Sequence, residues 1–548
     1  MRYIKWFAKA VRPYFGSIAV MMICHILLAA CSIGFVYVSK MLVDVAVALF
    51  GGHQVDDGLT LWAAVMVAIV VLRILLNAVR SYLQTRTEIR LKNGLRARLF
   101  DVLLHVENNG GERRHSGDII NRLQEDVRVV SSAFAVSLPN LLGTILQFTA
   151  AFIFMLTLDA RLALLILIVV PAGLLAGKYI TRRIRNLTLD IRKSDSQVQS
   201  HLQESLQHLT LLQSLEYTDT SSSELSGLQN TLYDNEIRRT RFSVVARIFI
   251  GLAFQAGHAI AFLWGVYGIS TGSVTYGMMT AFLQLVGQIQ RPLVDMSSQI
   301  PSLIHATASI DRLIELECLP LEDSSDSVVL EGTAGIMLED VSFAYPDSPK
   351  DVLHGFTFDF KPGSRTAIVG PTGVGKSTLI RLLLALLRPR SGNISLYTDS
   401  SASDMKILVS PAVRSNLVYV PQGNTLFSGT IRENLLMGNP AATEQQMHEA
   451  LHTAAADFVL SLPEGIDTHC FESGAGLSEG QAQRIAIARA LLRPGSILLL
   501  DEFSSALDSE TEVTLLERLT ERLPDHTMIF ITHRDRIIDY CDNVLRMS

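Results

Sequence analysis

Two kinds of hydrophobic pattern divide the chain. Long apolar stretches with few charges recur in its first part, whereas the later part mixes short apolar runs with polar turns. A helix needs about 20 mostly apolar residues to cross the hydrocarbon core of a bilayer. The pattern therefore predicts six membrane-spanning helices. They lie at 17–39, 59–83, 129–158, 162–177 and the two halves of 248–290, which a polar turn at 270–277 divides.

Basic residues gather on one side of these predicted spans. Lys and Arg are frequent in the N-terminal tail, in the connection after the second span and in 181–193 after the fourth, whereas the loops 51–58 and 270–277 contain neither. Because Lys and Arg favour the cytoplasmic side, we expect the N-terminus, both long connections and the C-terminal part there. The first apolar stretch exceeds the roughly 7–15-residue core of a cleavable signal peptide. We therefore expect a retained anchor in a multi-pass protein of a bacterial inner membrane.

Several polar side chains interrupt the apolar spans. Gln284, Gln288, Arg291 and Asp295 recur at helical spacing on one face, and the last two blur the end of the sixth span. Two interpretations remain open: hydrogen bonds that join helices, or a water-accessible path for a substrate. The candidate residues for such a path are Arg73, Gln255, His258, Gln284, Gln288, Arg291 and Asp295.

Composition excludes several other classes of protein. The net charge is −6, so no basic surface suggests a nucleic-acid partner. The five cysteines form no CxxC pair, which argues against a zinc site or a disulfide framework. A polar stretch at 321–335 is typical of a linker. We therefore expect a membrane domain at 1–320, the linker at 321–335 and a soluble α/β domain at 336–548.

A phosphate-binding loop stands near the start of the soluble part. The apolar run 366–370 predicts a strand, 378–387 predicts a helix, and the sequence between them matches G-x-x-x-x-G-K-[ST]. Glycines there allow backbone N–H groups to surround phosphates at a helix start. Lys376 is expected to contact the β- and γ-phosphates, and Ser377 to bind Mg²⁺. The loop residues are Gly370, Pro371, Thr372, Gly373, Val374, Gly375, Lys376, Ser377 and Thr378.

Two further apolar runs end in side chains that suit phosphate chemistry. The run 496–502 predicts a buried strand that delivers Asp501 and Glu502 at its carboxyl end. Asp501 is expected to hold Mg²⁺, and Glu502 to act on the attacking water as general base. The run 528–533 ends in His533, which is either structural or close to the γ-phosphate.

Taken together, these motifs resemble those of an ATP-binding cassette (ABC) transporter of the exporter type. The resemblance covers nearly the whole chain and is to a half-transporter, an α-helical six-span membrane domain followed by an α/β P-loop nucleotide-binding domain of ABC type. Tyr345 in FAYPD matches the aromatic residue that stacks on adenine, and Gln422 in VYVPQ matches the Q-loop glutamine. LSEGQ (477–481) matches the family signature and SALD (505–508) the D-loop, while His533 matches the switch histidine. The stretches 115–126 and 206–216 resemble the coupling-helix regions.

The resemblance implies ATP and Mg²⁺ as ligands and a dimer as the working unit. Two nucleotide-binding domains would meet head to tail, so that Ser478, Gly480 and Gln481 of one chain, with Asp508 of the D-loop, close over ATP on the other. Mg²⁺ would lie among Ser377, Gln422 and Asp501. The catalytic group would be Glu502 with His533 and Gln422. A homodimer would have two complete sites, and a heterodimer with a second half-transporter remains open.

Neither the transported molecule nor the direction of transport follows from these motifs. A small molecule, a lipid or a peptide is allowed, moved by export or by flipping between leaflets. Two alternatives to an exporter remain: an ATP-switched membrane regulator or channel, and an importer on an exporter-like fold.

Two positions depart from the family pattern. Glu479 replaces a glycine of LSGGQ, and Phe471 replaces a glycine common before the signature. Ser478 and Gln481 fit a capping box, and an acid in the first turn suits the helix dipole. At about 8 Å from the phosphates and an effective dielectric of about 20–80, the Glu479 carboxylate would repel ATP by roughly 0.5–2 kcal/mol. The dipole returns about 0.3–1 kcal/mol, so we expect Glu479 to be tolerated.

Overall fold

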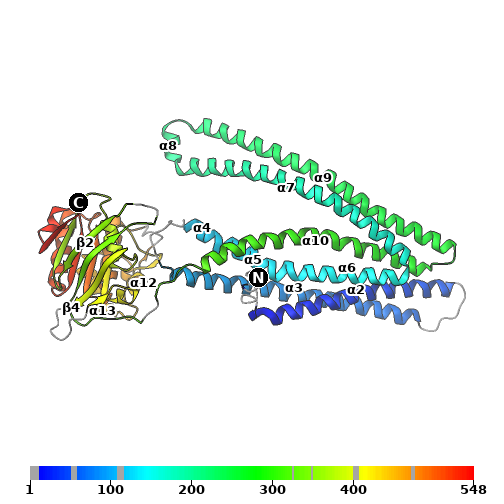
Figure 1. The fold of residues 1–548 in the computed structure, drawn as a ribbon, viewed down its shortest axis with the longest axis horizontal. Helices are drawn as coiled ribbons and strands as arrows, with labels where there is room; N and C mark the ends of the chain where they lie inside the picture. Colours follow the sequence, from blue (N-terminus) through cyan, green and yellow to red (C-terminus); the bar gives the residue numbers. More distant parts are fainter. Residues whose placement is uncertain are drawn as a thin grey trace. The chain divides into compact units, whose positions relative to one another are not determined.

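The chain forms two compact units in a computed structural model (Figure 1). The first comprises residues up to Phe100 together with Ile120–Glu315, and the second comprises Asp101–Ile119 together with Leu316–Ser548. The structure describes the backbone, but not the side chains, of residues 166–181, 250, 253, 297 and 298. The described residues are 6, 12–50, 58–107, 116–323, 326–346, 350–398, 406–470 and 476–548.

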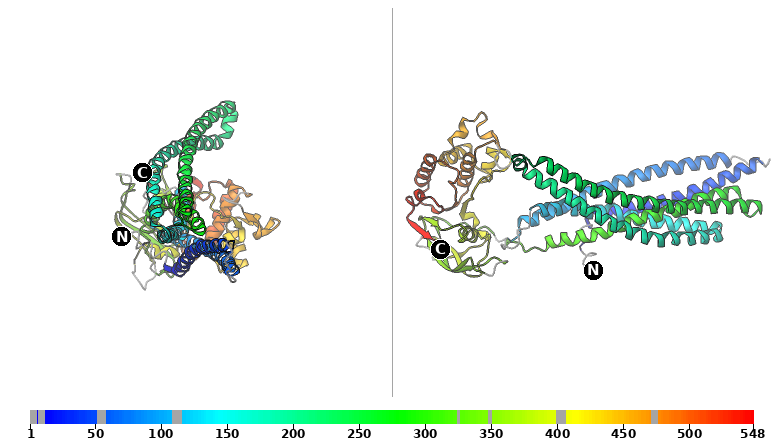
Figure 2. Two further views of the ribbon diagram at one scale, coloured as in Figure 1. Left: turned by 90° about the vertical axis from the view of Figure 1, so that its right-hand side faces the viewer. Right: turned by 90° about the horizontal axis from the view of Figure 1, so that it is seen from above.

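Long helices build the first unit. α7 and α9 run side by side, joined by the short α8 (Figures 1 and 2), and α2 packs along α6. Two short π-helical turns, η2 and η3, interrupt the approach to α6. The helices are η1 (Arg12–Tyr14), α2 (Phe15–Phe50), α3 (Gly58–Leu104), α4 (Ser116–Asn121), η2 (Arg122–Asp126), α5 (Val127–Ser132), η3 (Ala133–Ser137), α6 (Leu138–Leu158), α7 (Ala160–Gln207), α8 (Leu209–Ser214), α9 (Thr218–Ser270) and α10 (Tyr276–Glu317).

The core of this unit lies where α10 meets α2, α6 and α9. Phe282 and Leu285 of α10 are fully buried, together with Val36 of α2 and Met155 of α6. At the turn between α6 and α7, Asp159 caps α7 by accepting hydrogen bonds from two backbone N–H groups, and it also accepts one from Trp264 Nε1 of α9 at 2.9 Å. One acidic residue therefore ends α6, begins α7 and ties both to α9.

Four helical stretches within the described residues are long and apolar enough to cross a membrane: Arg12–Phe50, Gly58–Leu104, Gly117–Leu158 and Thr218–Ser270. They contain the predicted first, second, third and fifth spans. The predicted fourth span lies on α7, mostly where the side chains are outside the description. The sixth lies on α10, which is not among these four helices. The total of six therefore stays a prediction.

The two stretches that resemble coupling-helix regions are helical where they are described. His115 lies outside the described residues, and the rest of 115–126 forms α4 followed by the π-helical η2. The second region contains α8. The side chains of Leu209 and Leu211 on this helix and of Leu215 directly after it are exposed. In the first unit, Asp126 of η2 is 5% exposed and accepts a hydrogen bond from Arg312 Nε at 2.8 Å.

The described strands of the second unit form three sheets. A five-stranded parallel sheet has the order β11-β3-β10-β9-β6, a four-stranded antiparallel sheet has the order β2-β1-β4-β5, and β7 pairs with β8. The strands are β1 (Ala334–Phe343), β2 (Leu353–Phe360), β3 (Arg365–Val369), β4 (Ser391–Thr398), β5 (Ile407–Leu408), β6 (Leu417–Val420), β7 (Gly429–Thr430), β8 (His469–Cys470), β9 (Ile497–Asp501), β10 (Thr527–Ile531) and β11 (Asn543–Arg546).

Helices cover these sheets and complete two apolar cores, one around α11 and the other around α14. The predicted strands 366–370, 496–502 and 528–533 correspond to β3, β9 and β10, which are neighbours in the parallel sheet. Their carboxyl ends therefore meet at one edge. The helices are α11 (Lys376–Leu383), η4 (Pro411–Asn416), α12 (Ile431–Leu436), α13 (Glu444–Thr453), η5 (Asp457–Ser461), η6 (Gly465–Asp467), α14 (Glu479–Leu491), α15 (Ser509–Arg522) and α16 (Asp535–Ile538).

Candidate ATP site

The phosphate-binding loop lies between β3 and α11, as the motif predicts. Gly373 and Gly375 have φ values of 89° and 109°, which side-chain-bearing residues rarely adopt. Gly370 has no room for a side chain either, because an added Cβ would lie 2.6 Å from the carbonyl oxygen of Met547. Lys376 is nearly buried, and its Nζ donates to the carbonyl oxygens of Gly370 and Pro371 at 2.6 and 3.0 Å. The loop thus curls around an ammonium group, while the Ser377 hydroxyl is exposed.

Two acids stand at the end of β9, beside this loop. Asp501 is 8% exposed; burial and the Glu502 carboxylate raise its pKa, against a hydrogen bond from Tyr419 and the positive charges of Lys376 and Arg381. Burial and Asp501 likewise raise the pKa of Tyr419 to about 12, so this phenol stays a hydrogen-bond donor. The pair therefore concentrates oxygen ligands and negative charge where a cation would be stabilised.

Gln422, Glu502 and His533 converge although they follow three different strands. Gln422 Nε2 donates to Glu502 Oε2 at 2.6 Å, and His533 Nε2 lies 3.4 Å from Glu502 Oε1. Glu502 has a φ of 45°, unusual for a residue with a side chain, and its N–H donates to the carbonyl oxygen of Ile531 at 3.0 Å. The strand end thus holds one carboxylate, half-exposed, between an amide and an imidazole.

The signature forms the capped helix start that its sequence predicts. The Ser478 hydroxyl accepts a hydrogen bond from Gln481 N–H, and the Gln481 side chain accepts one from Ser478 N–H. Gly480 packs against the D-loop so tightly that an added Cβ would lie 2.6 Å from the Ala506 carbonyl oxygen. Glu479 is exposed, and Phe471 lies outside the described residues. Asp508, at the end of the D-loop, caps α15 by accepting from Thr511 N–H.

Tyr345 contacts the same region from β1's side of the unit. Its ring stands edge-on to Phe343, and its hydroxyl hydrogen-bonds with Thr378 Oγ1 at 3.1 Å and accepts from Arg381 at 3.3 Å. Both partners lie on α11: Thr378 ends the phosphate-loop motif, and Arg381 lies about one turn further along the helix. Its stacking on adenine stays a prediction.

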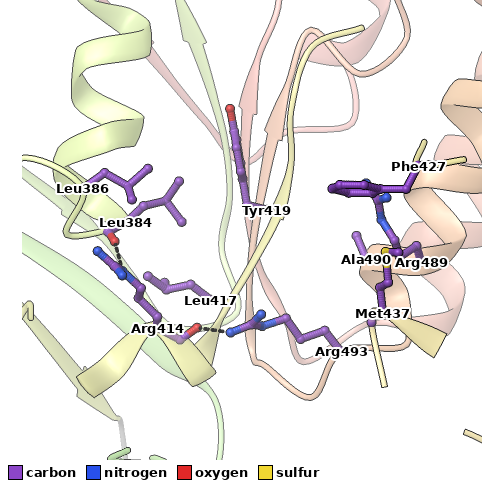
Figure 3. Close-up of a pocket in the computed structure, with 11 residues that line it drawn as sticks. Leu384, Leu386, Arg414, Leu417, Tyr419, Phe427, Met437, Arg489, Ala490 and Arg493 are labelled. Carbon is purple, nitrogen blue, oxygen red and sulfur yellow. Dashed lines mark hydrogen bonds between the residues drawn. The ribbon is translucent and has the colours of Figure 1, made fainter. Parts of the chain in front are cut away.

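A cleft beside the Q-loop adds a surface that the motifs do not predict (Figure 3). Its volume is about 390 Å³. Arg489 spans from α14 to the Q-loop, where it donates to the carbonyl and hydroxyl oxygens of Thr425 at 2.9 and 2.7 Å. Arg493 donates to the Arg414 carbonyl oxygen at 3.1 Å. The cleft is lined by Leu384, Leu386, Arg414, Leu417, Tyr419, Phe427, Met437, Gly438, Arg489, Ala490 and Arg493.

The chain entering this unit is fastened to it by arginines. Arg414 forms two hydrogen bonds of 2.7 Å with the Glu322 carboxylate in the predicted linker, and it also donates to the carbonyl oxygens of Leu384 and Ala385. Glu107, just beyond the end of α3, pairs with Arg388 at 2.5 Å. Neither pair could be found from the sequence, because each joins residues far apart in the chain.

The polar residues predicted for a substrate path have different surroundings in the structure. Gln288 Nε2 of α10 donates to the Ser32 carbonyl oxygen of α2 at 3.5 Å and so joins two helices, whereas His258 Nδ1 lies 3.1 Å from the Phe254 carbonyl oxygen within α9 itself. The Oε1 atoms of Gln284 and Gln288 are buried without a partner among the described residues. The Arg73 guanidinium lies 5.9 Å from the centre of the Phe35 ring. The remaining residues of the set, Gln255, Arg291 and Asp295, are exposed.

Comparisons with known proteins agree with this architecture. The family model for the ABC transporter transmembrane region matches 18–293, and the ABC transporter model matches 353–505. A putative multidrug export ATP-binding/permease protein of Bacillus subtilis, YgaD, is 28% identical, over 100% of this chain and 95% of its own. A fatty acid ABC transporter ATP-binding/permease protein of Mycobacterium tuberculosis is 29% identical, over 84% and 72%.

A solved structure gives the same result in three dimensions. The structure of a bacterial Atm1-family ABC exporter with ATP bound superimposes with a TM-score of 0.78 and 25% identity, over 98% of this chain and 94% of that one. The transmembrane family model alone spans half of the chain. The chain therefore belongs to the ABC transporter family, as a half-transporter with a helical membrane domain followed by an α/β nucleotide-binding domain.

Proposed function

We propose that this protein is an ATP-driven exporter that works as a dimer with two head-to-tail ATP sites. The observation that carries the proposal is the convergence of Gln422, Glu502 and His533 beside the phosphate loop. A membrane regulator that only binds ATP needs no positioned general base, so this convergence favours hydrolysis. Because the chain retains both halves of the site, including Ser478, a homodimer would contain two complete sites.

In this proposal the phosphate loop binds the phosphates of ATP, and the Glu502 carboxylate activates the attacking water. The N–H groups of Gly373–Lys376 and the start of α11 face the phosphates, and Lys376 exchanges its loop carbonyl partners for phosphate oxygens. Glu502 accepts a proton from the attacking water. Gln422 and His533 hold the Glu502 carboxylate from opposite oxygens, which fixes its direction. Ser478 and Gly480 of the partner chain close the site from the other side.

The residues present also fit Mg²⁺. Asp501 supplies a buried carboxylate, Ser377 a hydroxyl and Gln422 an amide oxygen, and hard oxygen ligands suit this ion. In the described part of the chain, no group of three or more His, Cys, Asp or Glu could hold a metal alone. That agrees with Mg²⁺ sites in which one or two carboxylates share the ion with substrate phosphates. When bound, the ion would neutralise charge on the phosphates.

We propose that α8 of one chain docks in the cleft beside the Q-loop of the other. α8 and its flanks expose Leu209, Leu211 and Leu215, which are 47%, 53% and 64% exposed. The cleft offers apolar contacts together with basic side chains, and Glu216 adjoins these leucines in the sequence. Arg489 links the cleft to the Q-loop. When ATP brings the two nucleotide-binding domains together, the cleft would therefore move α8 of the partner chain, and with it the helices α7 and α9 that α8 joins.

The substrate we propose is an amphipathic organic molecule. Relatives are named for multidrug export and for fatty acids, which share an apolar body. The stripe of Gln284, Gln288, Arg291 and Asp295 would bind the polar end of such a molecule. The N-terminus and the nucleotide-binding unit are proposed to be cytoplasmic, in a bacterial inner membrane, because the basic residues lie on that side.

The test is ATP hydrolysis by the purified chain in lipid nanodiscs, beside Glu502→Gln. We expect wild-type turnover, and near-complete loss in the variant with ATP binding retained. Turnover that persists in Glu502→Gln would remove Glu502 from the general-base role. A well-folded wild type without turnover would indicate a second, different subunit.

Direction is tested separately in sealed inside-out vesicles. ATP-dependent uptake of a fluorescent amphiphile into vesicles supports export. ATP-dependent efflux from preloaded vesicles would identify an importer, and hydrolysis without any flux would identify a regulator.

A further inference from the structure

Gln483 is a buried polar residue that none of the motifs explains. It lies on the inner face of α14, five residues after Ser478, and is 1% exposed. Its Nε2 donates to the carbonyl oxygen of Glu502 at 3.3 Å, and its Oε1 accepts from Ala506 N–H at 3.4 Å. A buried amide is costly unless its donor and acceptor are paired, and here both are paired within one turn of the catalytic strand end.

That turn needs external support. Glu502 has a φ of 45°, a conformation that is strained for a residue with a side chain and persists only when its surroundings hold it. Its N–H is held by the Ile531 carbonyl oxygen of β10. Gln483 donates a hydrogen bond to the other backbone group of Glu502, the carbonyl oxygen. The backbone of Glu502, from which its side chain projects, is therefore held by two elements, β10 and α14.

The same helix also meets the D-loop directly. Gly480 lies against the Ala506 carbonyl oxygen, while Gln483 binds the Ala506 N–H one turn further along α14. Both backbone groups of Ala506, its N–H and its carbonyl oxygen, thus contact α14. A displacement of the signature would be transmitted to Ala506 and to Glu502 through this contact.

We propose that Gln483 is a positioning residue for hydrolysis, which ties the backbone of Glu502 and the D-loop to the signature helix. The proposal rests on the proposed role of Glu502 as general base and on the head-to-tail dimer. In that dimer the signature contacts ATP on the partner chain. Gln483 then links the engagement of one ATP site to the geometry of the carboxylate that serves the other.

The test compares Gln483→Met with a matched buried control. Met keeps the length of the side chain and removes both amide hydrogen bonds. The control is Thr453→Val, which removes a hydroxyl that is 5% exposed and bonds only within α13, to the Glu449 carbonyl oxygen. Wild type and Glu502→Gln are measured alongside in nanodiscs, and the melting temperature of each variant is recorded.

We expect kcat of Gln483→Met to fall about tenfold, since each 1.36 kcal/mol of lost transition-state stabilisation is tenfold. KM for ATP should stay at its wild-type value, as should both parameters in Thr453→Val. A kcat equal to wild type would overturn the proposal. A rise in KM with kcat unchanged would also overturn it, because that pattern indicates a role in nucleotide binding instead.

Amide hydrogen exchange tests the same contact without turnover. In the absence of nucleotide, the peptide covering 502–507 should exchange faster in Gln483→Met and at the wild-type rate in Thr453→Val. If wild type alone does not hydrolyse ATP, the homodimer of the proposed function fails and a second, different subunit is indicated; the exchange experiment alone then decides the positioning role of Gln483. Unchanged exchange overturns it. Should Gln483→Met not fold, Gln483→Glu replaces it; its kcat relative to wild type should recover as pH is lowered, because the protonated carboxyl can again donate to Glu502.

Discussion

Gly480→Ala is the smallest change that should separate the signature from the D-loop. Gly480 is the second residue of α14, and its α-carbon faces the Ala506 carbonyl oxygen. An alanine Cβ would lie 2.6 Å from that oxygen and 3.4 Å from Leu507 Cδ2. Ordinary van der Waals contact begins near 3.4 Å, so the methyl group is 0.8 Å too close to the oxygen. Because the obstacle is backbone, no rotamer change relieves it.

The cost follows from this distance. Overpacking of a close-fitting site costs typically about 1–3 kcal/mol, and α14 or the D-loop must move by most of an ångström. A misplacement of about 1 Å in a catalytic arrangement can cost about 10²-fold in rate. We therefore expect kcat for ATP to fall about 10²-fold, while the phosphate loop, which Gly480 does not contact in its own chain, still binds ATP.

The assay measures steady-state ATP hydrolysis in nanodiscs together with equilibrium binding of ATP to each variant. Gly227→Ala is the control. Gly227 lies on the exposed side of α9 with nothing within 4 Å of an added Cβ, so the same substitution should stabilise its helix by about 0.5–1 kcal/mol and leave hydrolysis unchanged. Wild-type kcat in Gly480→Ala would refute the reasoning, since it would mean that the close contact carries no catalytic geometry.

Three other predictions concern single contacts. Asn434→Leu should lower stability by about 2–4 kcal/mol, measured by chemical unfolding followed by circular dichroism, because the fully buried amide holds the N–H and carbonyl groups of Phe427. Burial raises the pKa of Asp126, but hydrogen bonds from Arg312 and Ser309 outweigh it and hold this pKa below its usual value. Asp126 therefore contributes to the free energy of unfolding at pH values above its unfolded pKa, and this contribution is lost as pH falls through its folded pKa. Asp126→Asn should accordingly weaken the dependence of the unfolding free energy on pH in the acid range. Glu479→Gln should lower KM for ATP by about two- to thirtyfold and abolish part of its salt dependence, since a screened repulsion of roughly 0.5–2 kcal/mol is removed; a salt dependence identical to wild type would contradict this.

The convergence of Gln422, Glu502 and His533 could be predicted from sequence because each of them follows a strand of the parallel sheet. β3, β10 and β9 are short and apolar; the phosphate loop follows β3, His533 follows β10 and Glu502 follows β9, and neighbouring parallel strands bring these segments to one edge. The motif spacing therefore located Lys376, Glu502 and His533 before any distance was known. The helix predicted at 378–387 illustrates the limit of the same approach: α11 ends at Leu383, and Ala385 has a φ of 52°, which apolar periodicity does not reveal.

Contacts between distant segments could not be predicted in the same way. Arg414 and Glu322 are 92 residues apart, and the sequence around either residue gives no indication that the two form a pair. The Tyr345 hydroxyl bonds to α11 because β1 passes beside that helix, a consequence of sheet order. Gln483 left a weak signal, a polar residue on the apolar face of α14, but its two partners lie beyond the next strand.

The geometry of α14 explains why an acid can occupy position 479 of the signature. The helix start is fixed by the reciprocal Ser478–Gln481 cap, and its inner face by Gly480 and Gln483 against the D-loop and Glu502. Glu479 takes part in neither set and is exposed. A substitution there changes the charge near the phosphates without moving the backbone, whereas one methyl group at position 480 moves the backbone without changing the charge. Since charge is screened and close packing is not, the tolerant position and the intolerant position can be adjacent in the same turn.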